Sequence, residues 1–105
     1  MKKETGGRDR FGDFSPQFAG LTDDVLFGEV WSREEELSPK IRSIVTVSAL
    51  VSGGNLEQLG PHLEKAKENG VTKDEIIEVI THLAFYTGWP KAWSAFNLAE
   101  NVFDE

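Results

Sequence analysis

Two side chains near the middle of the chain have the chemistry of an acid and of an anion-binding group. His62 lies at the edge of the apolar helical stripe of residues 56–66, where an imidazole can reach into a pocket. Its ordinary pKa of about 6.5 suits proton transfer near neutral pH. Arg42 lies beside a second apolar stripe, and a guanidinium can hold a carboxylate through two hydrogen bonds. We therefore expect His62 and Arg42 to form the chemical centre of a site.

Each of these two residues also has a purely structural interpretation. A partly buried His62 can simply bond to a backbone carbonyl, and Arg42 can form an ion pair with Glu29 or Glu75. We assign Glu75 to a helix-capping box with Thr72, and not to the chemistry.

Four further side chains could contribute to the same site. Ser43 and Thr46 follow Arg42 and could donate hydroxyl hydrogen bonds, although hydroxyls inside helices more often bond to the preceding turn. His82 is either a second site residue or a packing residue. The Tyr86 hydroxyl could donate to an oxyanion, or the ring could pack in an interface.

Composition excludes several classes of function. The chain has no cysteine, which excludes disulfide scaffolds, thiol nucleophiles and dithiol redox motifs. The net charge of −7 disfavours nucleic acid as a partner. Two histidines twenty residues apart, with no cysteine, make a weak case for a metal site, so we expect no metal. No apolar run has membrane-spanning length and no secretory signal is evident, so we expect a cytoplasmic protein.

Start and stop signals predict helices throughout the chain. Ser15-Pro16 and Ser38-Pro39 are start signals, and Gly20 and Gly28 predict a short or split first helix. We expect a flexible tail over residues 1–12 and one all-α domain of about five to six helices over residues 13–105. Further helices are expected over residues 39–53, 55–69, 72–88 and 90–103, with Asn55 and Gln58 as a capping box and one buried stripe of Ile41, Ile44, Val45, Ser48 and Val51.

The aromatic side chains of the last helix bear on assembly. Trp89, Trp93, Phe96 and Phe103 offer more aromatic surface than one small domain readily buries. We therefore expect a homo-oligomer.

Four segments in order resemble the carboxymuconolactone decarboxylase family over residues 16–102. They are FGEVWSR, LSPKIRSIVTVSALV, HLEKAKENGVTKDEI and AFYTGWPKAWSAF. The resemblance implies the all-α fold that this family shares with the alkylhydroperoxidase D proteins, and a ring-like homo-oligomer, a trimer or hexamer.

The resemblance is to the branch of this family without thiol chemistry. The redox branch has a C-x-x-C pair at the positions of Asn55 and Gln58, and a glutamate at the position of Ser43. Because these groups are absent, we expect no thiol peroxidase or reductase activity.

The activity implied by the resemblance is cofactor-free decarboxylation of γ-carboxymuconolactone, a small lactone with two carboxylates, in the protocatechuate/β-ketoadipate route of aromatic catabolism. His62 would be the acid and Arg42 the carboxylate-binding group, with Glu29 and Trp31 in a stretch that approaches the pocket in the family. Two alternatives remain: a non-catalytic small-molecule-binding or structural oligomer, and an enzyme acting on another lactone or keto acid.

Overall fold

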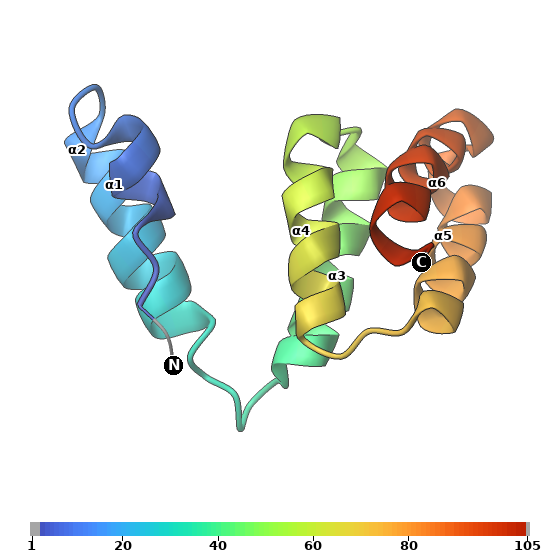
Figure 1. Ribbon diagram of the computed structural model, residues 1–105, viewed down its shortest axis with the longest axis horizontal. Coiled ribbons are helices and arrows are strands. Elements are labelled where there is room, and N and C mark those ends of the chain that lie inside the picture. The colour runs from blue at the N-terminus through green and yellow to red at the C-terminus, as the bar shows by residue number, and fades with distance from the viewer. Residues whose placement is uncertain (1–2, 105) are drawn as a thin grey trace. The chain divides into compact units, whose positions relative to one another are not determined.

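The computed structural model describes residues 3–104, and all regular structure in that range is helical (Figure 1). The prediction of an all-α fold is confirmed. The chain divides after Ser38 into two compact units, which we call unit 1 (residues up to Ser38) and unit 2 (Pro39 onwards). Across residues 3–104 no helix is both long and apolar enough to cross a membrane.

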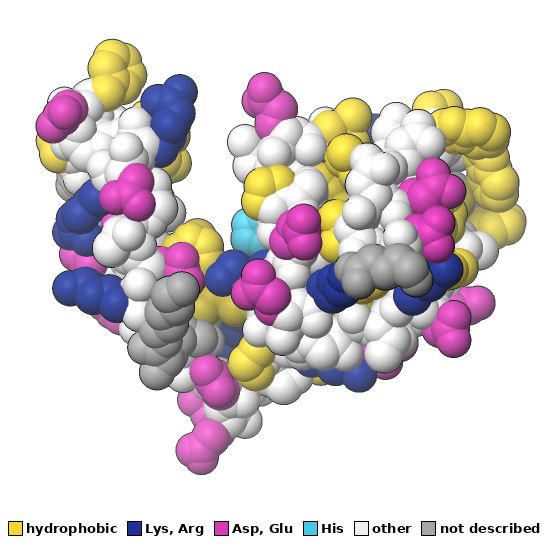
Figure 2. All heavy atoms as spheres, in the orientation of Figure 1, with side chains coloured by type: hydrophobic (Ala, Val, Ile, Leu, Met, Phe, Trp, Pro, Cys, Tyr) yellow, Lys and Arg dark blue, Asp and Glu magenta, His cyan; other side chains and the backbone are white. Residues whose placement is uncertain are grey.

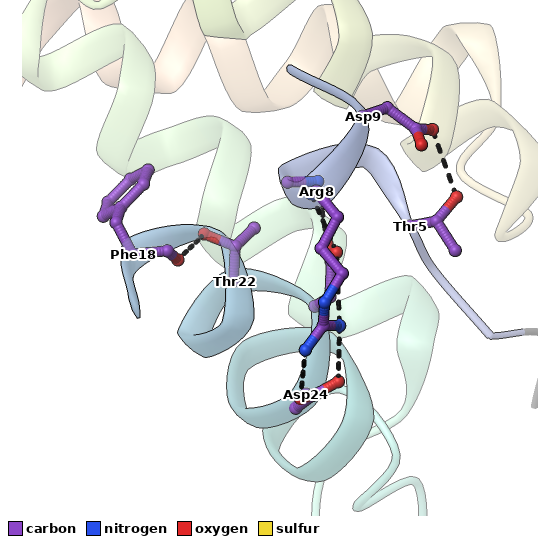
Figure 3. A network of polar contacts seen from close by, with 8 residues as sticks. Thr5, Arg8, Asp9, Phe18, Thr22 and Asp24 are labelled. Atoms are coloured by element: carbon purple, nitrogen blue, oxygen red, sulfur yellow. Dashed lines mark hydrogen bonds and ion pairs between the residues drawn. The ribbon is translucent and has the colours of Figure 1, made fainter. Parts of the chain in front are cut away.

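Unit 1 contains a short helix in the stretch where a tail was expected. Helix α1 (Gly6–Phe11) begins where the buried carboxylate of Asp23 accepts the backbone N–H groups of Gly7 and Arg8, at 2.7 and 2.9 Å. A carboxylate at a helix N-terminus satisfies donors that lack helical partners. Arg8 also binds Asp24 through two hydrogen bonds of 2.9 and 2.7 Å (Figure 3). The expected tail thus forms a helix over these residues, whereas residues 1 and 2 lie outside the described range.

A second helical stretch of unit 1 changes its hydrogen-bonding pattern along its length. Helix α2 (Pro16–Gly20) continues directly into the π-helical segment η1 (Leu21–Val30), which ends with the Trp31 N–H donating to the Leu26 carbonyl at 2.9 Å. The short or split helix predicted from Gly20 and Gly28 is not observed as a break, because α2 runs directly into η1: the hydrogen-bonding pattern changes after Gly20, and Gly28 lies inside η1.

Unit 2 is a four-helix arrangement. Its helices are α3 (Pro39–Gly53), α4 (Leu56–Glu68), α5 (Lys73–Thr87) and α6 (Trp89–Phe103). Helix α3 packs against α4 and α5, helix α6 packs against the same two, and α3 also touches α6. Within the described residues α4 and α5 do not pack against each other, so they occupy opposite corners of unit 2 (Figure 1).

Aliphatic side chains and alanines from all four helices fill the core of unit 2. The Leu59, Leu63 and Ala66 side chains of α4, and Ile76 and Ile80 of α5, are almost completely buried. These residues follow the spacings predicted for the two helices. Helix α6 contributes its small residues to this core, namely Ala92, Ala95 and Ala99.

The predicted buried stripe of α3 is wrong in part. The buried line is Ser43, Val47 and Val51, while Ile41 and Val45 are 44% and 55% exposed. Periodicity alone placed the stripe wrongly because it could not identify the polar Ser43 as a core position. The Asn69 side chain, which donates to the Ser43 hydroxyl at 2.9 Å, supplies the hydrogen bond that permits this burial.

The two predicted capping boxes can each be compared with the helix start that the structure shows. Thr72 and Glu75 form the predicted capping box at the start of α5. The Asn55–Gln58 box is wrong, because the Asn55 side chain makes no capping bond to α4. Gly88 joins α5 to α6 at φ 102°, a conformation that side chains with a Cβ rarely adopt.

Candidate functional site

His62 occupies the exposed edge of the α4 stripe. Its neighbours Leu59, Leu63 and Ala66 are buried, whereas the imidazole is only partly buried. The Nδ1 atom nevertheless lies out of contact with solvent. The imidazole is therefore partly enclosed by the protein and partly accessible to solvent.

Burial lowers the pKa of His62 below the ordinary value for histidine, and the nearby positive charge of Lys65 lowers this pKa further. Both causes disfavour the imidazolium, because desolvation and like charge raise the free energy of the charged form. The imidazole is accordingly neutral in most molecules at pH 7. A negatively charged ligand beside the ring would act in the opposite direction and raise its pKa.

Arg42, Ser43 and Thr46 lie in the first half of α3. Arg42 is partly buried, with its Nε atom out of contact with solvent. The Thr46 hydroxyl donates to the Arg42 carbonyl at 2.9 Å, which is the bond to the preceding turn that helical threonines commonly make. Ser43 is buried and accepts from Asn69. In this conformation both hydroxyls are therefore engaged within the protein.

The bond between Asn69 and Ser43 also sets the register of Arg42 and His62. Helices α3 and α4 run antiparallel through a short turn, and Asn69 at the end of α4 lies beside Ser43. His62 precedes Asn69 by seven residues, so its backbone lies about 10 Å along the helix pair from the level of Ser43 and Arg42. A ligand that contacts both side chains must span much of this distance. Because the arginine side chain is long, the span required of the ligand is shorter than the distance between the two backbones.

His82 and Tyr86 lie elsewhere, on α5. Their rings stack with centroids 5.0 Å apart and an interplanar angle of 26°. Both side chains are exposed, Tyr86 by 78%. Because α4 and α5 do not pack together within the described residues, one chain does not bring this pair beside His62.

Glu29 and Trp31 belong to unit 1. Glu29 is exposed on η1, and Trp31 is buried and stacks on Phe27 with centroids 6.2 Å apart. Glu75 has the capping role expected for it and also pairs with Lys40 of α3 at 2.9 Å. These two contacts lower the pKa of Glu75, with the bond from the Thr72 backbone as the larger cause.

Sequence analysis missed two residues that act on the site. Lys65 influences the charge of His62, and its spacing of three residues on the same helix was a usable signal. Asn69 holds Ser43, but nothing local to Asn69 indicates a partner that lies 26 residues away. Among residues 3–104, no three or more His, Asp or Glu side chains come together as metal ligands would.

Two comparisons with known proteins point to the same family. The sequence pattern of the carboxymuconolactone decarboxylase family matches residues 16–101. The chain is 40% identical to a 4-carboxymuconolactone decarboxylase of Acinetobacter baylyi over 93 residues, which are 89% of this chain and 69% of that protein.

Two further relatives match with lower identity. The chain is 33% identical to a nitrosuccinic acid decarboxylase of Metarhizium robertsii, over 81% of this chain and 59% of that protein. It is 32% identical to an uncharacterized 15.0 kDa protein of Paracoccus denitrificans, over 78% of this chain and 62% of that protein. The chain thus spans between 59% and 69% of the length of these three relatives.

Proposed function

Because this chain belongs to the carboxymuconolactone decarboxylase family, we propose that it is a carboxy-lyase that decarboxylates a small carboxylated lactone of the γ-carboxymuconolactone type without a cofactor. The observation that carries the proposal is the half-buried imidazole of His62, on a helix of a chain related to two decarboxylases. The proposed setting is aromatic catabolism in the cytoplasm, and the proposed assembly is a homo-oligomer, a trimer or hexamer.

The reaction defines what the protein must supply. The C–C bond to the departing carboxylate breaks, carbon dioxide leaves, and the electron pair passes into a dienolate conjugated with the lactone carbonyl. A proton then adds to carbon and gives the enol-lactone. The protein must hold the carboxylate that remains, stabilise the negative charge and deliver the proton.

Arg42 and His62 have the chemistry for two of these tasks. Arg42 would bind the remaining carboxylate, because a guanidinium pairs with both oxygens of a carboxylate. His62 would donate the proton. Its low pKa in the free protein means that the ligand must promote its protonation, and a dicarboxylate close to the ring raises the pKa in that direction.

Ser43, Thr46, Glu29, Trp31, Tyr86 and His82 remain proposed contributors to substrate binding. For the two hydroxyls, contact with a ligand requires an exchange of the hydrogen bonds described above. For Tyr86 and His82, it requires a second copy of the chain, because the two rings lie on the opposite corner of unit 2 from α4.

A second substrate class is favoured by one comparison. The relative from Metarhizium robertsii is named for nitrosuccinic acid, which is also a small dicarboxylate. Loss of carbon dioxide beside a nitro group leaves a delocalised anion, as it does beside a conjugated lactone. The same arginine and histidine would serve both reactions, so both substrates should be assayed.

The test is a spectrophotometric assay of the purified protein with γ-carboxymuconolactone, in a chelator and without added cofactor. We expect turnover that is lost in Arg42→Ala mainly through a raised KM, and no effect of Glu64→Gln, an exposed substitution on α4. Absence of turnover with either substrate, from a folded protein, would remove the catalytic proposal and favour the binding or structural alternative or another lactone or keto acid.

A further inference from the structure

A groove runs along the face of unit 2 that α5 and α6 form. It has a volume of about 700 Å³, and α4 does not contribute to it. Its walls carry aromatic and aliphatic side chains, among them Ile77, Trp89, Trp93 and Phe96. Figure 2 shows hydrophobic side chains gathered over this edge of unit 2.

The aromatic surface beside the groove is too large to be a scattered set of exposed residues. Trp89 and Trp93 are 58% and 65% exposed, and Phe85, one turn before Trp89, is 76% exposed. Phe85 and Trp89 contact each other edge to face at 5.9 Å between centroids. With 150–250 Å² for a whole aromatic side chain, these three leave roughly 400 Å² exposed. A stable interface buries about 800 Å² per partner, so the three rings supply about half of that area and the groove walls add to it.

The shape of this face favours pairing with a copy of itself. The tryptophans project from the N-terminal half of α6, whereas the C-terminal half presents Ala99 and the nearly buried Phe103 to the groove. Antiparallel pairing about a two-fold axis near Phe96 would place the projecting half of each α6 over the hollow half of the other. Parallel pairing would instead oppose the tryptophans.

The charges at the groove do not oppose this arrangement. Lys73 and Asp104 at one end pair with each other at 3.0 Å, so they largely cancel. Glu100 is the remaining charged group of the lining. The lining therefore carries one net negative charge of a chain total of −7, so two copies can approach over this face with little repulsion.

We infer that the α5–α6 face is an isologous interface, in which Trp89 and Trp93 of one copy enter the groove of a second copy, antiparallel about a two-fold axis near Phe96. This inference rests on the proposed homo-oligomer and specifies its two-fold contact. It does not depend on the decarboxylase activity, because His62 and Arg42 lie on other helices.

The first experiment uses the absence of native cysteine. Asn97 is exposed on the groove face one turn beyond Trp93, so two Asn97→Cys copies should form a disulfide-linked dimer under mild oxidation. Glu64→Cys, exposed on α4, is the matched control and should remain uncrosslinked. Crosslinking of Glu64→Cys but not of Asn97→Cys, or equal crosslinking of both, would overturn the two-fold contact.

The second experiment is sedimentation equilibrium of Trp93→Ser and of Phe14→Ser, a control that removes an exposed aromatic ring from unit 1. We expect Trp93→Ser to raise the dissociation constant of the two-fold contact roughly tenfold or more, because buried tryptophans dominate interface energetics. Phe14→Ser should leave it unchanged. An oligomer that Trp93→Ser does not weaken overturns this interface but not self-association, whereas a monomer at all concentrations overturns both.

Discussion

The environment of His62 lowers its pKa and so disfavours its protonated form. An ordinary histidine is half protonated at about pH 6.5, whereas burial and Lys65 keep this imidazole neutral to a lower pH. Its folded-state pKa lies below its unfolded-state value, so the folded protein binds fewer protons. The stability that the neutral form contributes is present above the unfolded pKa and is lost as the pH falls through the folded pKa.

The first prediction concerns this titration. Lys65→Gln should raise the pKa of His62 but leave it below the ordinary value, because burial is the larger cause and remains. The measurement is the chemical shift of the imidazole against pH by NMR. A pKa at or above the ordinary value in the original chain would contradict the assigned burial effect.

The second prediction concerns the pH dependence of the reaction. If protonated His62 is the donor, kcat/KM should decrease about tenfold per pH unit above the pKa of His62 in the free protein. In Lys65→Gln the inflection should move to higher pH together with the pKa measured by NMR. An inflection that does not follow the NMR value would assign the proton transfer to another group.

At the scale of elements, helix termini are fixed by single side chains. Asp23 of η1 supplies the only side-chain acceptor described at the start of α1, and it approaches Gly7 so closely that a Cβ there would lie 2.8 Å from its Oδ1 atom. Asp24 beside it makes an exposed ion pair with Arg8, which also lowers the Asp24 pKa through the hydrogen bond from the guanidinium. Exposed pairs of this kind contribute little to stability.

The third prediction separates these two carboxylates. Asp23→Ala should accelerate hydrogen exchange of the α1 amides, because it leaves the Gly7 and Arg8 N–H groups without their acceptor. Asp24→Ala should change exchange much less. Equal protection of α1 in both variants would show that Asp23 does not hold the helix.

A fourth prediction concerns the start of α5. Thr72→Ala should destabilise the protein by about 1 kcal/mol, the usual effect of losing an N-cap hydroxyl. Asn55→Ala at the start of α4 should have a smaller effect, since its side chain makes no capping bond. Chemical denaturation of both variants provides the comparison. A cost at Asn55 equal to that at Thr72 would contradict the observed caps.

The same contrast explains which elements the sequence could predict. Helix type and most boundaries follow from local signals, so the four helices of unit 2 were predictable from Pro39, Gly70, Thr72 and Gly88. Positions that depend on distant partners were not predictable. Ser43 is a core residue only because Asn69 reaches it, and α1 forms where Asp23 accepts its amides.

For the whole molecule, charge and apolar surface act in opposite directions. The net charge of −7 opposes association, while the exposed aromatic face of α5 and α6 favours it. The sequence predicted self-association from Trp89, Trp93, Phe96 and Phe103; of these the two tryptophans are exposed, whereas Phe103 is buried and Phe96 packs against the core. The spatial relation of the candidate site residues required the helix packing, which separates His82 and Tyr86 from His62.

The fifth prediction concerns the balance between charge repulsion and apolar contact in self-association. Raising the salt concentration should strengthen self-association, because salt screens the repulsion between acidic copies and leaves apolar contact in place. Sedimentation equilibrium at two ionic strengths measures the effect. Weaker association at high salt would indicate that ion pairs, and not the aromatic face, hold the copies together.

We propose that this chain is a decarboxylase that uses His62 as its acid. The most direct measurement is the rate of carbon dioxide release from γ-carboxymuconolactone by the original chain and by His62→Gln, at equal concentrations and with the oligomeric state of each verified. We predict release by the original chain and its loss in His62→Gln without a change in assembly. Equal rates in the two proteins would exclude His62 as the proton donor, and no release from either would contradict the proposed reaction on this substrate.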